Sequence, residues 1–169
     1  FGIPPLGSSY KTHSTFIFPR NLFDYYSVTK SNSSCIDFSG HPEGSPDISD
    51  SDLEKAMKDK KPFADYIVTQ WLLNPNPINE FISKQSLPVH VGITGPLKIT
   101  SLIKFANIVG AKNSINFLKS NATKALDLLR PSDPNNLIEK VKGSTNNFHI
   151  YTFGGLKETN KWLVKNNYA

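Results

Sequence analysis

The chain has 169 residues, 38% hydrophobic and 20% charged, a balance typical of one soluble globular domain with a sizeable core. No apolar run approaches the roughly 18 residues that a membrane-spanning helix needs, and no basic start followed by an apolar stretch indicates a signal peptide. The sequence therefore predicts a protein of the cytoplasm or the mitochondrial matrix without membrane insertion. Its single cysteine, Cys35, excludes an internal disulfide.

The net charge of +5 comes from lysine, since the chain holds 17 Lys and only two Arg, Arg20 and Arg130. Proteins that read nucleic acids usually depend on arginine for bidentate contacts with bases and phosphates. The lysines are also scattered along the chain. We therefore predict diffuse solvation and no nucleic-acid partner, with weak attraction of anions as the alternative.

Extended and helical segments alternate after an irregular arm, residues 1–32, whose first half is rich in proline and serine. Residues 33–169 are predicted to form one domain. Strands are predicted near 34–39, 65–71, 88–93 and 147–153. Helices are predicted over 21–30, over 52–61, from about 77, in a block from 102 to 129, over 131–143 and over 157–166.

This alternation of strands and helices favours parallel β/α units, because parallel neighbours need a crossover that is usually a helix. The predicted strands are near-continuous apolar runs, as expected for a sheet with both faces covered. The sequence therefore predicts an α/β fold with four parallel strands in one sheet.

Polar residues stand where each predicted strand ends. They are Ser39-Gly40-His41-Pro42-Glu43, Thr69-Gln70-Trp71, Thr94-Gly95-Pro96 and Tyr151-Thr152-Phe153-Gly154-Gly155. In parallel α/β folds the ligands bind at the carboxyl ends of the strands, and these ends share one edge of the sheet. The sequence therefore predicts a binding site at this edge.

Each of these residues also has a purely structural interpretation. His41 and Glu43 fit an ordinary loop, Gln70 fits a bond to a neighbouring strand, and Gly95-Pro96 fits a plain turn. Gly154-Gly155 fits a phosphate cradle at the start of the last helix, although it matches no known phosphate-loop pattern. His90 and His149 lie inside strands and fit core histidines. No Cys/His cluster, GxSxG or HExxH pattern indicates a metal or hydrolase site.

Four stretches, in this order, resemble a known family: "SGHPEGSP" from residue 39, "ADYIVTQW" from 64, "LPVHVGITGP" from 87 and "FHIYTFGGLKETNKW" from 148. They are similar to the second half of methylenetetrahydrofolate reductase, in particular to a short divergent branch. "HPEGSP" is similar to the Tyr-Pro-Glu-x-His-Pro signature, "IVTQW" to a strand ending in Thr-Gln-Phe, and "FHIYTF" to His-Phe-Tyr-Thr-Leu. The resemblance covers residues 33–166 well.

The resemblance implies the second half of a (β/α)8 barrel that holds FAD, which takes hydride from a nicotinamide and reduces methylenetetrahydrofolate. It places Gln70 on the pterin with Trp71 beside it, and Thr94 and Tyr151 at the strand ends that flank the folate. It also implies four contacts with the flavin cofactor: His41, Glu43, Asp52 and Lys60.

Four strands cannot close a barrel, and by resemblance the catalytic acid and several flavin contacts belong to the other half. Neither Gly2 nor Ile3 is the Asp that the family has near its prolines, and Ser45 stands where the family has His. We therefore expect a chain that is inactive alone and needs a protein partner or a second copy to cover the half-barrel. The alternative is a non-catalytic structural subunit of a larger, possibly mitochondrial, assembly derived from that fold.

Overall fold

The computed structural model describes residues 35–45, 47–108, 114, 116, 117, 120 and 131–168. The predicted arm 1–32 with its helix 21–30, and most of the predicted helical segment beyond residue 108, lie outside the described residues.

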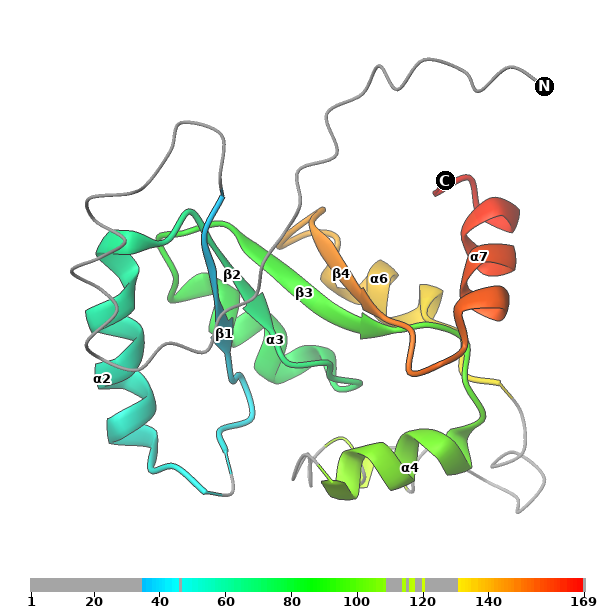
Figure 1. Ribbon diagram of the computed structural model, residues 1–169, viewed down its shortest axis with the longest axis horizontal. Helices are drawn as coiled ribbons and strands as arrows, with labels where there is room; N and C mark the ends of the chain where they lie inside the picture. Colours follow the sequence, from blue (N-terminus) through cyan, green and yellow to red (C-terminus); the bar gives the residue numbers. More distant parts are fainter. Residues whose placement is uncertain are drawn as a thin grey trace, which may run out of the picture.

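The described residues form a mixed α/β structure around a four-stranded parallel sheet in the order β1-β2-β3-β4 (Figure 1). The strands are β1 (Asp37–Gly40), β2 (Tyr66–Thr69), β3 (Val89–Thr94) and β4 (Phe148–Tyr151). The predicted parallel sheet is therefore confirmed, and each strand lies within or close to its predicted range. Strands that follow one another in both chain and sheet are compatible with half of a β/α barrel.

The helices are α2 (Asp50–Lys60), α3 (Pro75–Ser83), α4 (Ile99–Ile108), α6 (Asn135–Val141) and α7 (Leu156–Lys165), with a 3-10 turn η2 (Lys61–Phe63) after α2. α2 begins where the Ser49 side chain accepts the backbone N–H of Asp52. α3 begins earlier than predicted, because Asn74 caps it and Pro75, rather than Pro77, takes the first helical position. α6 lies inside the predicted segment 131–143.

The main hydrophobic core lies between the sheet and helices α3, α6 and α7. From the strands, Phe38, Ile67 and Val91 point into it. The helices contribute Ile78, Leu137, Ile138, Val141 and Trp162. Burial of each such side chain is worth about 1.5–3 kcal/mol, so this layer fixes one face of the sheet against its helices.

A second, smaller core lies beyond the ends of β2 and β3, where Trp71 packs with Leu102 and Ala106 of α4. Trp71 is only 2% exposed. β2 ends at Thr69, before both Gln70 and Trp71, so strand alternation does not force their side chains onto opposite sides.

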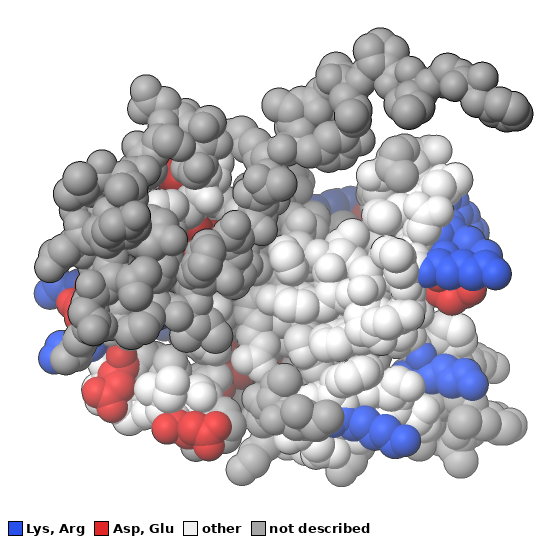
Figure 2. Space-filling view, viewed as in Figure 1, with Lys and Arg blue, Asp and Glu red and all other residues white. Residues whose placement is uncertain are grey.

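Coverage of the sheet differs from strand to strand. β2 is buried throughout, whereas all four residues of β4 are only half-buried. The expectation of strands covered on both faces therefore fails at β4, which ends the described sheet. Figure 2 shows the same face of the molecule as Figure 1. Uncharged side chains cover β3 and β4 on this face, lysines lie over α4 and α7, and both acidic and basic side chains lie around α2.

Candidate functional site

The carboxyl edge of the sheet brings His41 and Gln70 together. Gln70 directly follows β2, and its backbone N–H donates to the Gly40 carbonyl at 2.9 Å. Both side chains are half-buried. Burial lowers the pKa of His41 below its ordinary 6.5, and a hydrogen bond with the Gln70 side chain partly opposes this shift. His41 is therefore a neutral imidazole at pH 7, able to donate or accept a hydrogen bond.

Tyr151 reaches this pair from β4 by crossing Gly92 of β3. Its phenol donates to the Thr69 carbonyl at 3.2 Å, directly before Gln70. A Cβ on Gly92 would lie 2.3 Å from that carbonyl oxygen and 2.8 Å from the Tyr151 ring. Only glycine leaves room for the ring there. Burial, and then the charge of Asp37, raise the pKa of Tyr151, so its phenol stays a donor at neutral pH.

Thr94 ends β3 in register with Tyr151 and is only 3% exposed. The next residue, Gly95, donates its N–H to the Tyr151 carbonyl at 3.1 Å. A Cβ on Gly95 would lie 2.1 Å from the Thr159 hydroxyl, so α7 packs directly on this strand end. Thr94 is thus a buried part of the edge, next to the phenol.

Aromatic rings gather beside this edge. Phe153 stacks on Phe105 of α4 with centroids 4.4 Å apart and planes at 19°. It lies 5.9 Å from Tyr151 and meets Trp71 edge-on at 5.5 Å. Phe153 has a φ of 45°, a left-handed conformation that costs a non-glycine residue energy and that clusters at functional sites. The Trp71 Nε1 atom is buried without a hydrogen-bond partner among the described residues.

The two strand histidines lie on the sheet face opposite the main core. His90 stacks on Tyr66 with centroids 4.2 Å apart, and His149 meets Tyr151 at 4.7 Å. Both are half-buried. These contacts extend the polar and aromatic lining from the carboxyl edge along that face.

Glu43 is held by Ser114, which is fully buried. The Ser114 N–H donates to Glu43 Oε2 at 3.3 Å and the Ser114 hydroxyl to Oε1 at 3.1 Å. Burial raises the pKa of Glu43, and the bonds from the side chain and then the backbone of Ser114 partly oppose this shift.

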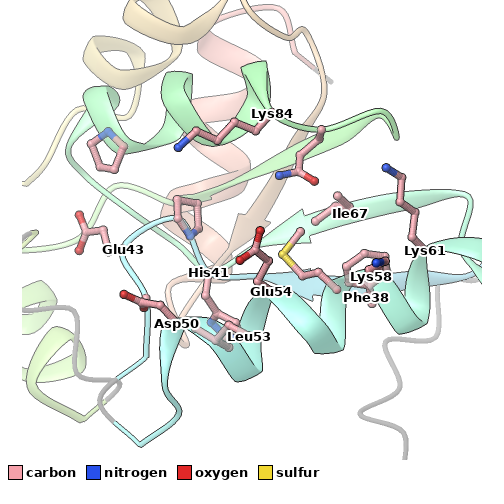
Figure 3. Close-up of a pocket in the computed structure, with 15 residues that line it drawn as sticks. Phe38, His41, Glu43, Asp50, Leu53, Glu54, Lys58, Lys61, Ile67 and Lys84 are labelled. Atoms are coloured by element: carbon pink, nitrogen blue, oxygen red, sulfur yellow. The ribbon is translucent and has the colours of Figure 1, made fainter.

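A groove of about 730 Å³ opens between α2 and α3, with Phe38 and Ile67 on its floor (Figure 3). His41 and Glu43 line one end of it and Lys61 the other. It lies on the helix-covered side of the sheet, away from Tyr151, so it is separate from the carboxyl edge except at the shared loop after β1.

Asp52 and Lys60 do not line this groove. Asp52 is exposed in the first turn of α2, where its Oδ2 accepts the Ser49 hydroxyl at 2.7 Å. Lys60 is in the last turn, eight residues on, about 12 Å along the helix axis. The structure thus brings together four of the predicted residues, His41, Gln70, Thr94 and Tyr151. It leaves Asp52 apart, whereas the charge of Lys60 acts on His41 and, after burial, helps to lower its pKa.

At the start of α7, Gly154 has a φ of 81° and Gly155 is the N-cap, with no side-chain cap bond. The phosphate cradle at this turn stays a prediction. Among the described residues, no group of three or more His, Cys, Asp or Glu side chains could hold a metal ion.

Sequence reasoning did not find Phe105 or Ser114. Phe105 lies between the helical core positions Leu102 and Ala106, so its pattern is that of an ordinary amphipathic helix. Ser114 contacts a residue 71 positions earlier, which no local pattern reveals. Gly92 did carry a signal, because glycine inside a strand often marks a close approach.

A scan against models of known protein families finds no match for this sequence. Of the helices in the described residues, none is both long and apolar enough to cross a membrane.

Proposed function

We propose that this chain is the ligand-binding half of a methylenetetrahydrofolate reductase-like β/α barrel, and that its carboxyl edge binds the pterin ring of a folate. The observation that carries the proposal is the meeting of Gln70, His41 and Tyr151 at one edge of a parallel sheet. An amide, a neutral imidazole and a phenol offer the mixed donors and acceptors that a pterin ring presents.

The aromatic rings beside the edge support a flat ligand. Phe153 and Phe105 form a stacked pair next to Tyr151, and aromatic faces pack well against a planar heterocycle. The Trp71 N–H, which is buried without a hydrogen-bond partner among the described residues, supports the proposal as well. A buried donor without an acceptor costs about 1–3 kcal/mol, which an acceptor on a ligand would offset.

The residues fit the flavin less well than the folate. Glu43 is bonded to Ser114, Asp52 to Ser49, and Lys60 lies at the far end of α2. When bound, FAD would supply hydride transfer. Of the four predicted flavin contacts, His41 is the one that lies at the carboxyl edge, where it bonds the Gln70 side chain. We therefore assign His41, Gln70 and Tyr151 to folate binding and orientation, and leave flavin binding as a prediction that depends on the other half of the barrel.

The alternative function, a non-catalytic structural subunit, has its own support. Leu156 and Val164 of α7 are 69% and 60% exposed, and β4 is half-buried along its length. An apolar helix surface beside an under-covered strand is typical of an interface. A partner or a second copy that covers this end would serve either function, because it would also complete the barrel.

Calorimetric titration of the full chain with 5-formyltetrahydrofolate tests the proposal. We expect binding that weakens at least tenfold in Gln70→Ala, the loss of roughly one hydrogen bond in a buried site. Gln85→Ala is the matched control, since Gln85 lines the α2–α3 groove and its side-chain amide, within the described part of the chain, donates to the Phe81 carbonyl in the last turn of α3. Absence of binding to the wild-type chain, or equal loss in both variants, would overturn the proposal and leave the structural subunit.

A further inference from the structure

Three segments that are distant in the sequence meet at Ser114. Its hydroxyl donates to Glu43 Oε1, in the loop after β1, and accepts the N–H of Leu73, in the turn after β2, at 3.3 Å. Its own N–H donates to Glu43 Oε2. We call this chain of three bonds, Glu43–Ser114–Leu73, the clamp.

The two segments that the clamp joins are those that carry His41 and Gln70. His41 is two residues before Glu43, and Gln70 is three residues before Leu73. The same two segments are also joined by the backbone bond from Gln70 to the Gly40 carbonyl and by the hydrogen bond between the His41 and Gln70 side chains. Beyond these bonds the turn after β2 keeps a tie to β3, from the Leu72 N–H to the Gly92 carbonyl at 3.3 Å, and the clamp joins this turn to the loop after β1.

We propose that Glu43 is a positioning residue, which through Ser114 fixes the loop after β1 against the turn after β2 and so keeps His41 and Gln70 in contact. The ligand part of this inference rests on the proposed function, whereas the clamp itself does not. Glu43 in this role touches no ligand. It acts by holding the two side chains that do.

The charge on Glu43 should make the clamp depend on pH. Burial raises the pKa of Glu43 in the closed clamp, and opening that exposes Glu43 to water would return its pKa to the ordinary value. The closed form therefore binds a proton more readily, and clamping strengthens as pH falls through the raised pKa. The charged or titratable side chains that line the same groove are His41, Asp50 and Glu54, and also Lys58, Lys61 and Lys84 (Figure 3).

Amide hydrogen exchange of the full chain tests the clamp without any ligand. Glu43→Ala removes no atom that touches Leu73, yet we expect the Leu73 amide to exchange about tenfold faster, because the acceptor Ser114 is no longer held. Glu43→Gln keeps an acceptor and should retain most protection while losing its pH dependence. Glu54→Ala is the control, since Glu54 lines the same groove and has no bond in the described residues.

In a parallel titration with 5-formyltetrahydrofolate, Glu43→Ala should weaken binding about tenfold and Glu54→Ala should not. Unchanged Leu73 exchange in Glu43→Ala would overturn the inference whatever the ligand does. Faster exchange with unchanged affinity would overturn the positioning role. Faster exchange in a chain that binds no folate would support the clamp and reject the proposed function. If Glu43→Ala does not fold, Ser114→Ala, which removes the Leu73 acceptor directly, takes its place with the same expected outcomes.

Discussion

Replacing Gly92 with alanine tests the packing that brings Tyr151 to the end of β2. The new Cβ would lie 2.3 Å from the Thr69 carbonyl oxygen, 2.8 Å from the Tyr151 ring and 2.9 Å from the Gln70 carbonyl carbon. Two of these atoms are backbone of a central strand and cannot move alone. Overpacking of this kind costs about 1–3 kcal/mol, and we expect the upper part of that range.

Urea unfolding followed by tryptophan fluorescence measures this loss. With a slope of about 1–3 kcal/mol/M, we expect the midpoint of Gly92→Ala to fall by roughly 1–2 M. Gly143→Ala is the matched control, because a Cβ there meets nothing within 4 Å, so its midpoint should barely change. Adding Tyr151→Ala to Gly92→Ala should recover only part of the loss, since the Thr69 contact persists. Equal midpoints for Gly92→Ala and Gly143→Ala would refute the reasoning.

Three further predictions concern stability and ionisation. The pKa of Tyr66 is raised from its ordinary value of 10 to about 12, so the free energy of unfolding should fall as the pH rises from 10 toward 12. Urea midpoints measured across that pH range should fall less steeply for Tyr66→Phe than for the wild-type chain, and identical slopes would contradict the prediction. The pKa of His41 is lowered, so the free energy of unfolding should decrease as the pH falls below 6.5. An NMR titration of the His41 ring protons should give a pKa below 6.5, and a pKa above 6.5 would contradict the burial of this side chain. Ser49→Ala removes the N-cap of α2 and should lower the free energy of unfolding, measured with urea, by about 1 kcal/mol. Ser86→Ala, at an exposed serine, is the neutral control, and an equal effect of the two substitutions would show that the cap contributes nothing.

Local patterns were sufficient to predict the strands and the presence of helices α2, α3, α4, α6 and α7. The apolar run at Tyr66–Thr69, for example, acts over a few residues, which is the range that a sequence pattern covers. The start of α3 was misplaced because two prolines compete for one position, and only the Asn74 cap decides between them.

The rest of the candidate site depends on contacts between distant residues. Tyr151 reaches Thr69 across 82 positions, and only the register of β3 with β4 puts the ring over Gly92. The stack of Phe105 on Phe153 likewise joins a helix to a strand end. The parallel edge was predictable, but the side chains that meet on it were set by register, which the sequence alone did not give.

The central claim is that the carboxyl edge, rather than any other surface, receives a folate. The most direct measurement is the change in amide chemical shifts when 5-formyltetrahydrofolate is added to the full isotope-labelled chain. We predict saturable shifts at the Gln70 side-chain amide and at the backbone amides of His41, Gly95 and Phe153, with little change along α2. Shifts confined to the groove between α2 and α3, or no shifts at all, would contradict the claim.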